Sequence, residues 1–181
     1  MKKKTEWLIP GLCLVVIFSG LFIGAKQRPL EQVSVPPSAG AFFGFLPSKI
    51  ALNKNEEIPV KLFLVPEKGL FLDGIDVLLS FDPKAVEVTR VVPEKIFSFS
   101  FFRREDLVKG RISVTFLEEK KDGVLLKDQS TLLTIFLKAK EPSSSEVSVV
   151  WAEKGPSTVI IQTKTSQKIL FDSQKLLILT D

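Results

Sequence analysis

Two pairs of adjacent carboxylates, Glu56-Glu57 and Glu118-Glu119, are the residues best suited to acid–base chemistry in this sequence. A glycoside hydrolase needs two carboxyl groups that face each other across a cleft. Neighbouring residues of a strand point to opposite faces of a sheet, so neither pair meets that requirement by itself. The sequence also has no histidine, the commonest general base, and no G-x-S-x-G motif around a serine. We therefore expect a protein that is not an enzyme and needs no cofactor.

Three aspartates, Asp73, Asp76 and Asp82, lie close together in the sequence. Carboxylate oxygens are the ligands that calcium prefers, so these side chains could gather around such an ion. No D-x-[DN]-x-[DN]-G calcium loop accompanies them. The sequence predicts no metal site and leaves calcium binding open.

The net charge of +4 and the pI near 9.1 invite a nucleic-acid interpretation. Part of the excess comes from Lys2, Lys3 and Lys4, which precede the first apolar run. Elsewhere lysines and glutamates are interspersed, without the basic stripe or patch that nucleic-acid binders carry. We predict no nucleic-acid partner.

The N-terminal region predicts a membrane anchor followed by a tether. Residues 7–25 (WLIPGLCLVVIFSGLFIGA) carry no charge and are long enough for a helix that crosses the hydrocarbon core. The lysines before this run place residues 1–6 in the cytoplasm. A signal peptide cleaved after Ala25 is the alternative. Residues 26–40 are rich in proline and predict an extended linker. With either an anchor or a cleaved signal peptide, the remainder of the chain lies at the cell surface, outside the cytoplasm.

From residue 41 to residue 181 apolar residues recur at every second position, as in half-buried strands. The clearest runs are residues 58–64, 112–116 and 147–151, and the last of these places Trp151 on the core-facing side. Turn signals such as Asp82-Pro83 and Asp122-Gly123 separate the runs. No segment has the period of an amphipathic helix. The pattern predicts an all-β sandwich of about nine short strands.

Residues 71–83 (FLDGIDVLLSFDP) form the most informative of these strands. The side suited to the core carries Phe71, Ile75, Val77, Leu79 and Phe81. The outward side carries Gly74, Asp76, Leu78 and Ser80. A mixed outward side can meet either solvent or a partner, and the proline at position 83 ends the strand because it cannot donate to the ladder.

The segment GIDVLLSFDPKAVEVTRVVPEKIF (residues 74–97) resembles the signature of bacterial cohesin modules. Three other segments resemble further cohesin strands: NKNEEIPVKLFL, KGRISVTFLEE and STLLTIFLKAKEPSSSEVSV. The resemblance implies a jelly-roll sandwich of the cohesin and carbohydrate-binding-module superfamily. In that family one sheet face clasps a small helical module, the dockerin. The family's partner-contacting aspartate falls on Asp76, whereas Gly74 stands where well-studied members carry a polar residue.

Aromatic residues supply a second set of candidates. Phe97, Phe99 and Phe101 share one side of a strand, which favours a core stripe over a platform for sugar rings. The next residues, Phe102, Arg103 and Arg104, have the composition of an interface anchor: an aromatic beside two arginines.

These observations predict a membrane-anchored module that binds a protein, dockerin-like or of the cell envelope, through the outward side of residues 74–80. Two alternatives remain open at this stage. One is a carbohydrate-binding module for polysaccharides of the envelope or the extracellular space. The other is a structural spacer of an envelope assembly.

Overall fold

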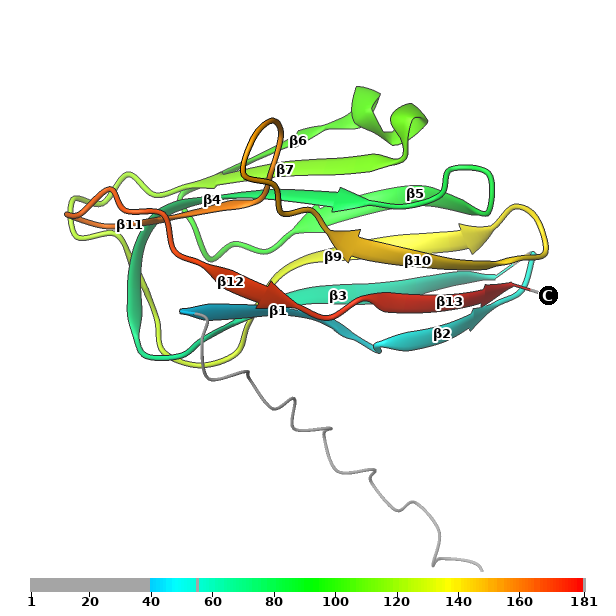
Figure 1. Cartoon of the computed structure of the whole chain (residues 1–181), viewed down its shortest axis with the longest axis horizontal. Helices are drawn as coiled ribbons and strands as arrows, with labels where there is room; N and C mark the ends of the chain where they lie inside the picture. Colours follow the sequence, from blue (N-terminus) through cyan, green and yellow to red (C-terminus); the bar gives the residue numbers. More distant parts are fainter. Residues whose placement is uncertain (1–39, 55, 181) are drawn as a thin grey trace, which may run out of the picture. The chain divides into compact units, whose positions relative to one another are not determined.

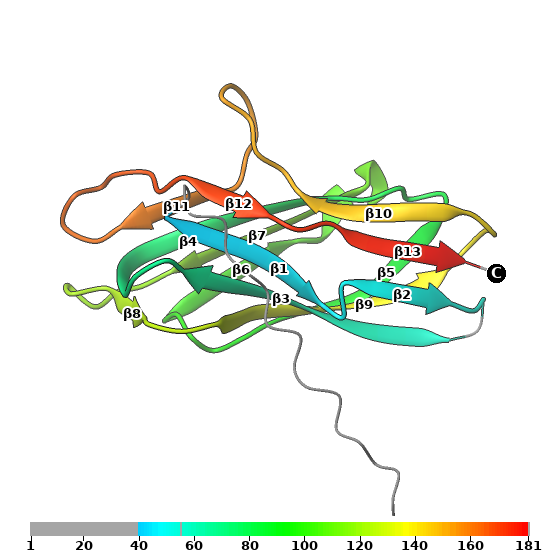
Figure 2. The same cartoon turned by 60° about the horizontal axis from the view of Figure 1, so that its bottom comes forward.

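The computed structural model describes residues 40–54 and 56–180, which form two mixed β-sheets packed face to face (Figures 1 and 2). The strands of the first sheet lie in the order β12 (Phe171–Ser173), β1 (Ala41–Leu46), β3 (Glu57–Pro66), β9 (Ser130–Ala139) and β5 (Val86–Pro93). The main path of the second sheet is β2 (Lys49–Leu52), β13 (Leu176–Thr180), β10 (Ser144–Val149), β4 (Leu70–Ser80), β7 (Arg111–Leu117) and β6 (Phe99–Arg103). The short strands β8 (Val124–Leu126) and β11 (Val159–Gln162) also pair with β4, and the 3-10 helix η1 (Arg104–Lys109) joins β6 to β7. The predicted all-β sandwich is confirmed.

The described residues hold thirteen strands, more than the expected nine or so, partly because the neighbours of the long strand β4 are interrupted. On one side β4 pairs with β7 through residues 74–80 and with β8 through residues 70–72. On its other side it pairs with β10 through residues 79–80 and with β11 through residues 72–76. Each edge of β4 therefore pairs with two successive strands in place of one continuous strand.

The core lies between the inner faces of the two sheets, as in other sandwiches. The alternation predicted for β7 is confirmed by the burial of Ile112 and Phe116. In β3, Leu62 and Leu64 are buried as expected, but Phe63, which alternation places on the opposite side, is buried too, at the point where the pairing with β9 shifts register. Nearly all buried apolar residues of the described part belong to one hydrophobic cluster, and this part lies within a single compact unit of the chain. This part of the chain thus closes its own core.

The turn after β4 follows the predicted Asp-Pro signal. The Asp82 side chain accepts a hydrogen bond from the Lys84 N–H at 2.9 Å, and its carbonyl accepts one from the Val86 N–H at 3.1 Å. Gly110, which ends η1, has φ 71°, and a Cβ there would lie 2.4 Å from the Phe81 carbonyl oxygen. A glycine is therefore required where the chain turns into β7.

Trp151 was expected in the core, and this expectation is wrong: the side chain is 54% exposed. The strand pattern continues to Trp151 in the sequence, but β10 ends at Val149. The chain then leaves the sheet in a loop that projects from the sandwich before returning as β11 (Figures 1 and 2).

The predicted anchor, residues 7–25, and nearly all of the predicted linker lie outside the described residues. Within residues 40–54 and 56–180, no helix is long and apolar enough to cross a membrane.

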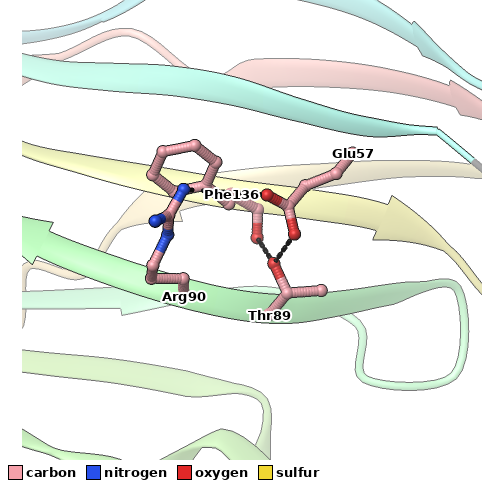
Figure 3. Close-up of polar contacts among 4 residues, drawn as sticks. All are labelled: Glu57, Thr89, Arg90 and Phe136. Carbon is pink, nitrogen blue, oxygen red and sulfur yellow. Dashed lines mark hydrogen bonds and ion pairs between the residues drawn. The ribbon is translucent and has the colours of Figure 1, made fainter.

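The solvent side of the first sheet carries a polar cluster that ties three strands together (Figure 3). The Thr89 hydroxyl lies 2.6 Å from a Glu57 carboxylate oxygen and 3.2 Å from the Phe136 carbonyl oxygen. The Arg90 guanidinium lies 3.8 Å from the centre of the Phe136 ring. Because these contacts join β5, β9 and β3, we interpret the cluster as stabilising the pairing of these three strands.

Candidate partner-binding face

The solvent side of β6, β7, β4 and β11, termed here the outer face, contains the candidate residues. Residues directly opposite each other in antiparallel strands share a face of the sheet. One such row consists of Phe101, Thr115, Asp76 and Val159. The neighbouring row consists of Phe99, Leu117, Gly74 and Ile161. The sheet register thus brings segments that are far apart in the sequence onto one surface.

Asp76 lies in the interior of this face, with β7 on one side and β11 on the other, and its side chain is exposed. Its carboxylate is therefore available to a partner from a rigid position in the sheet. Ser80 is half-buried near the end of β4, opposite Arg111 and Ser148.

Leu78 was expected to face outward, but it is only 7% exposed. It lies in the gap between the pairing of β4 with β10 and the pairing of β4 with β11. The Val150–Thr158 segment fills this gap: the Leu78 carbonyl accepts the Val150 N–H at 2.8 Å, and the Leu78 N–H donates to the Thr158 hydroxyl at 2.9 Å. Leu78 is therefore unavailable as a contact residue.

Gly74 is buried, although it belongs to the outward parity. A Cβ at this position would lie 2.7 Å from the Phe116 carbonyl oxygen and 3.2 Å from Cδ2 of Leu117. The backbone of β7 thus approaches too closely for a side chain, and Leu117 lies beside the glycine. The outer face presents an exposed leucine at the point where a side chain of residue 74 would project.

Five large apolar side chains are exposed on or beside this face, and sequence reasoning had placed three of them in the core. They are Phe71 (47%), Phe99 (53%), Phe101 (63%), Leu117 (53%) and Leu125 (37%). Phe71 is opposite Leu125, and Phe99 is opposite Leu117, so the exposed residues come from four different strands. Exposed apolar side chains that gather in this way mark interaction surfaces.

Phe71 was predicted on the core side of β4, and the reason that this prediction is wrong lies within the strand. Ile161 pairs with Gly74 and Gln162 with Leu72, which leaves Asp73 as an extra residue in β4. Such a bulge reverses the parity of the residues before it. Leu72 consequently points into the core, fully buried, and Phe71 points outward.

The expected core stripe of Phe97, Phe99 and Phe101 is correct only for Phe97. Phe97 precedes β6, is 7% exposed and packs with its ring 5.6 Å from that of Phe116. Phe99 and Phe101 belong to β6, which pairs only with β7 in the described part of the chain. Their side of this edge strand has no second layer above it.

The three residues predicted as an interface anchor, Phe102, Arg103 and Arg104, do not share one exposed surface in the described features. Phe102 is half-buried and packs against the core, whereas its neighbour Phe101 is exposed. Arg103 is exposed and shares the parity of Phe101 on the outer face. Arg104 belongs to η1, and the position of its side chain is outside the described features.

Two hydrogen bonds fix polar groups at the borders of the face. The Ser113 hydroxyl donates to the Asp106 carboxylate at 2.7 Å, which ties η1 to β7. The Ser98 hydroxyl donates to the Glu118 carboxylate at 2.6 Å, just before β6. This bond, with the Lys120 N–H as a second donor, lowers the pKa of Glu118 below its usual value. The carboxylate therefore holds the entry of β6 against the end of β7.

Asp73, Asp76 and Asp82 do not gather around a common point. Among residues 40–54 and 56–180, no group of three histidine, cysteine, aspartate or glutamate side chains lies close enough to hold a metal ion.

No protein-family model and no curated protein matches the chain. Solved structures do match its fold. A chain of a type I cohesin–dockerin complex from Clostridium thermocellum gives a TM-score of 0.62 at 14% sequence identity, covering 84% of this chain and 100% of that chain. A type I cohesin from Pseudobacteroides cellulosolvens gives 0.59 at 14% identity, covering 78% of this chain and 92% of that chain.

A non-cellulosomal cohesin from the archaeon Archaeoglobus fulgidus gives a TM-score of 0.58 at 12% identity, covering 79% of this chain and 92% of that chain. At these identities the likeness concerns the fold alone. It agrees with the sequence resemblance in residues 74–97, and the described part of this chain has the fold of the cohesin domains.

Proposed function

We propose that this chain is a protein-binding module that docks a partner on its outer face. The observation that carries the proposal is the exposure of Phe71, Phe99, Phe101, Leu117 and Leu125 on the sheet surface that also presents Asp76. Protein interfaces combine a buried apolar centre, enriched in aromatic residues, with a polar rim. The outer face presents both kinds of side chain: exposed apolar residues, and charges that include Asp76 in its interior and Arg103 on its edge strand.

The cohesin fold supports a protein partner. Two of the cohesins with this fold were solved with dockerins, one from Clostridium thermocellum and one from R. flavefaciens. We propose a partner of the same general kind, a small folded module that covers the exposed phenylalanines and places a cation or a hydrogen-bond donor against Asp76. Asp76 would then set orientation, and the phenylalanines would supply most of the apolar contact area.

The test is capture by residues 40–181, which close their own core and match nearly the full length of solved cohesins. Immobilised wild type, Asp76→Lys and Phe101→Lys are exposed to proteins from the native cell surface, and the affinity of any retained protein is then measured after purification. Leu179→Lys is the control, because Leu179 is 44% exposed but belongs to β13, outside the outer face.

We expect one protein that wild type and Leu179→Lys retain equally. Each outer-face variant should bind it at least about tenfold more weakly, the loss typical of an interface hot spot. Equal affinity for all four proteins would refute docking through this face.

We further propose that residues 7–25 anchor the module in a membrane, with residues 1–6 in the cytoplasm and the sandwich outside. The support is the uncharged apolar run and the lysines before it. The full chain should remain with membranes after alkaline extraction, and protease added to intact cells should remove the sandwich. Release of the full chain by alkali would contradict an uncleaved anchor.

A further inference from the structure

We infer that the pocket beside Trp151 binds a pyranose ring of an oligosaccharide. The pocket has a volume of about 410 Å³ and lies between the β10–β11 loop and residues 168–171. Trp151, Leu170, Glu153, Lys168 and Ser157 are among its lining residues. The pocket adjoins the outer face at Val159, but docking on that face is argued from other side chains.

Both walls of the pocket are held by hydrogen bonds. At the base of the loop, the Thr158 N–H donates to the Val150 carbonyl at 2.8 Å, and the Ala152 N–H donates to the Ser157 hydroxyl at 2.9 Å. The second wall is joined to β11, where the Ile169 N–H donates to the Ile160 carbonyl at 3.1 Å. The pocket is therefore formed before a ligand arrives, which reduces the entropy lost on binding.

The side chains of the pocket have the mixed character that a sugar ring requires. The indole of Trp151 is 54% exposed, and Leu170 is 67% exposed. A pyranose ring has an apolar C–H face, which can stack on an indole, and hydroxyl groups around its edge. Glu153 and Lys168 are exposed at the pocket, and neither forms an ion pair within the described part of the chain. They can serve as acceptor and donor for those hydroxyl groups.

The geometry favours a sugar over a peptide strand or a protein. One edge of β11 pairs with β4, and the other is occupied by the contacts of Ile160 and Ile161 with Ile169 and Lys168. A peptide therefore finds no free strand edge in this wall. Small-ligand sites are concave, with apolar walls and a few polar groups, whereas the outer face offers an exposed sheet surface.

Trp151 provides its own reporter. The chain contains two tryptophans, Trp7 and Trp151, and no tyrosine, so Trp151 is the only strong fluorophore of residues 40–181. We propose titrating this part of the chain with cellotetraose, chitotetraose and tetragalacturonate. A saturable change of tryptophan emission with at least one of them is expected. The three probes separate neutral, amino-sugar and acidic glycans, and a preference for the acidic one should disappear in Lys168→Ala.

Calorimetry with the same oligosaccharide then compares variants. Trp151→Ala should weaken binding by about tenfold or more, the usual effect of removing an aromatic anchor, and Trp151→Phe should recover part of the loss. Phe101→Ala is the matched control: an exposed aromatic of the outer face whose loss should leave sugar binding unchanged.

Two results would overturn the inference. One is the absence of any emission change or heat with all three oligosaccharides at millimolar concentration. The other is equal sugar affinity of wild type and Trp151→Ala. If Trp151→Ala instead loses only the captured protein, the pocket belongs to protein docking and the sugar site is refuted. Docking through Asp76 and Phe101 is tested separately by the capture experiment.

Discussion

Thr158 and Leu78 are joined by two hydrogen bonds across the gap between β10 and β11. The Leu78 N–H donates to the Thr158 hydroxyl at 2.9 Å, and the hydroxyl donates to the Leu78 carbonyl at 3.1 Å. Both residues are buried. The Thr158 hydroxyl thus replaces the backbone hydrogen-bonding partner that a neighbouring strand would provide to Leu78. The chain can therefore leave the sheet after β10 and form the β10–β11 loop that carries Trp151.

Thr158→Val should destabilise the sandwich by about 1–3 kcal/mol, because the Leu78 N–H loses its partner while remaining buried. Thr158→Ser is the control, since it keeps the hydroxyl. The free energy of unfolding of residues 40–181 in urea measures the effect. Equal free energies for the valine and serine variants would show that the hydroxyl contributes nothing at this site.

Gly74→Ala should also destabilise the sandwich, by about 1–3 kcal/mol, because the new Cβ would lie 2.7 Å from the Phe116 carbonyl oxygen. Gly69→Ala is the matched control in the turn before β4, where the nearest atom to a Cβ would be Cδ1 of Leu125 at 3.5 Å. Urea unfolding of both variants gives the comparison. Equal stability of the Gly74 and Gly69 variants would mean that the backbone of β7 can shift away from the new Cβ at little cost in free energy.

The alternation of apolar residues was sufficient to predict the sandwich, because burial on one side of a strand leaves a period of two in the sequence. It identified the buried sides of β3 and β7 and the outward position of Asp76. It failed for Phe71 because the extra residue Asp73 reverses parity without altering composition. The apolar pattern looks the same with or without such a bulge, so the sequence alone does not reveal it.

The candidate face was predicted less completely than the fold, for a related reason. Alternation shows which residues share a side but not whether a second layer covers that side. Phe99 and Phe101 are apolar like core residues, but they lie on the solvent side of β6, which no second layer covers in the described part of the chain. Trp151 likewise continues the β10 pattern after the strand has ended. Exposed aromatics of this kind are detected only once the pairing of the strands is known.

The three phenylalanines around β6 should respond very differently to truncation. Phe97→Ala removes a buried ring that contacts Phe116 and should cost about 3–5 kcal/mol of unfolding free energy. Phe101→Ala removes an exposed ring and should change stability by no more than about 0.5 kcal/mol. Thermal and urea unfolding distinguish the two. Similar losses of stability in both variants would indicate that Phe101 is buried like Phe97. The exposed apolar surface on which the docking proposal depends would then be absent.

The hydrogen bond between Ser98 and Glu118 should make stability depend on pH. The Ser98 hydroxyl and the Lys120 N–H stabilise the charged carboxylate and lower the pKa of Glu118 in the folded state. A group with a lowered folded-state pKa contributes stability above its unfolded pKa, about 4.3 for glutamate. That contribution is lost as the pH falls through the folded-state pKa.

Ser98→Ala should therefore raise the pKa of Glu118 toward its ordinary value, which carboxyl NMR titration of residues 40–181 measures directly. The stability difference between wild type and this variant should be present at pH 7 and should shrink once Glu118 is protonated in both. Ser100→Ala, a substitution of another exposed serine two residues further on, should leave the titration of Glu118 unchanged. If Ser98→Ala leaves the pKa of Glu118 at its wild-type position, the hydroxyl does not hold this carboxylate, and β6 must be fixed at its entry by its backbone pairing with β7 alone.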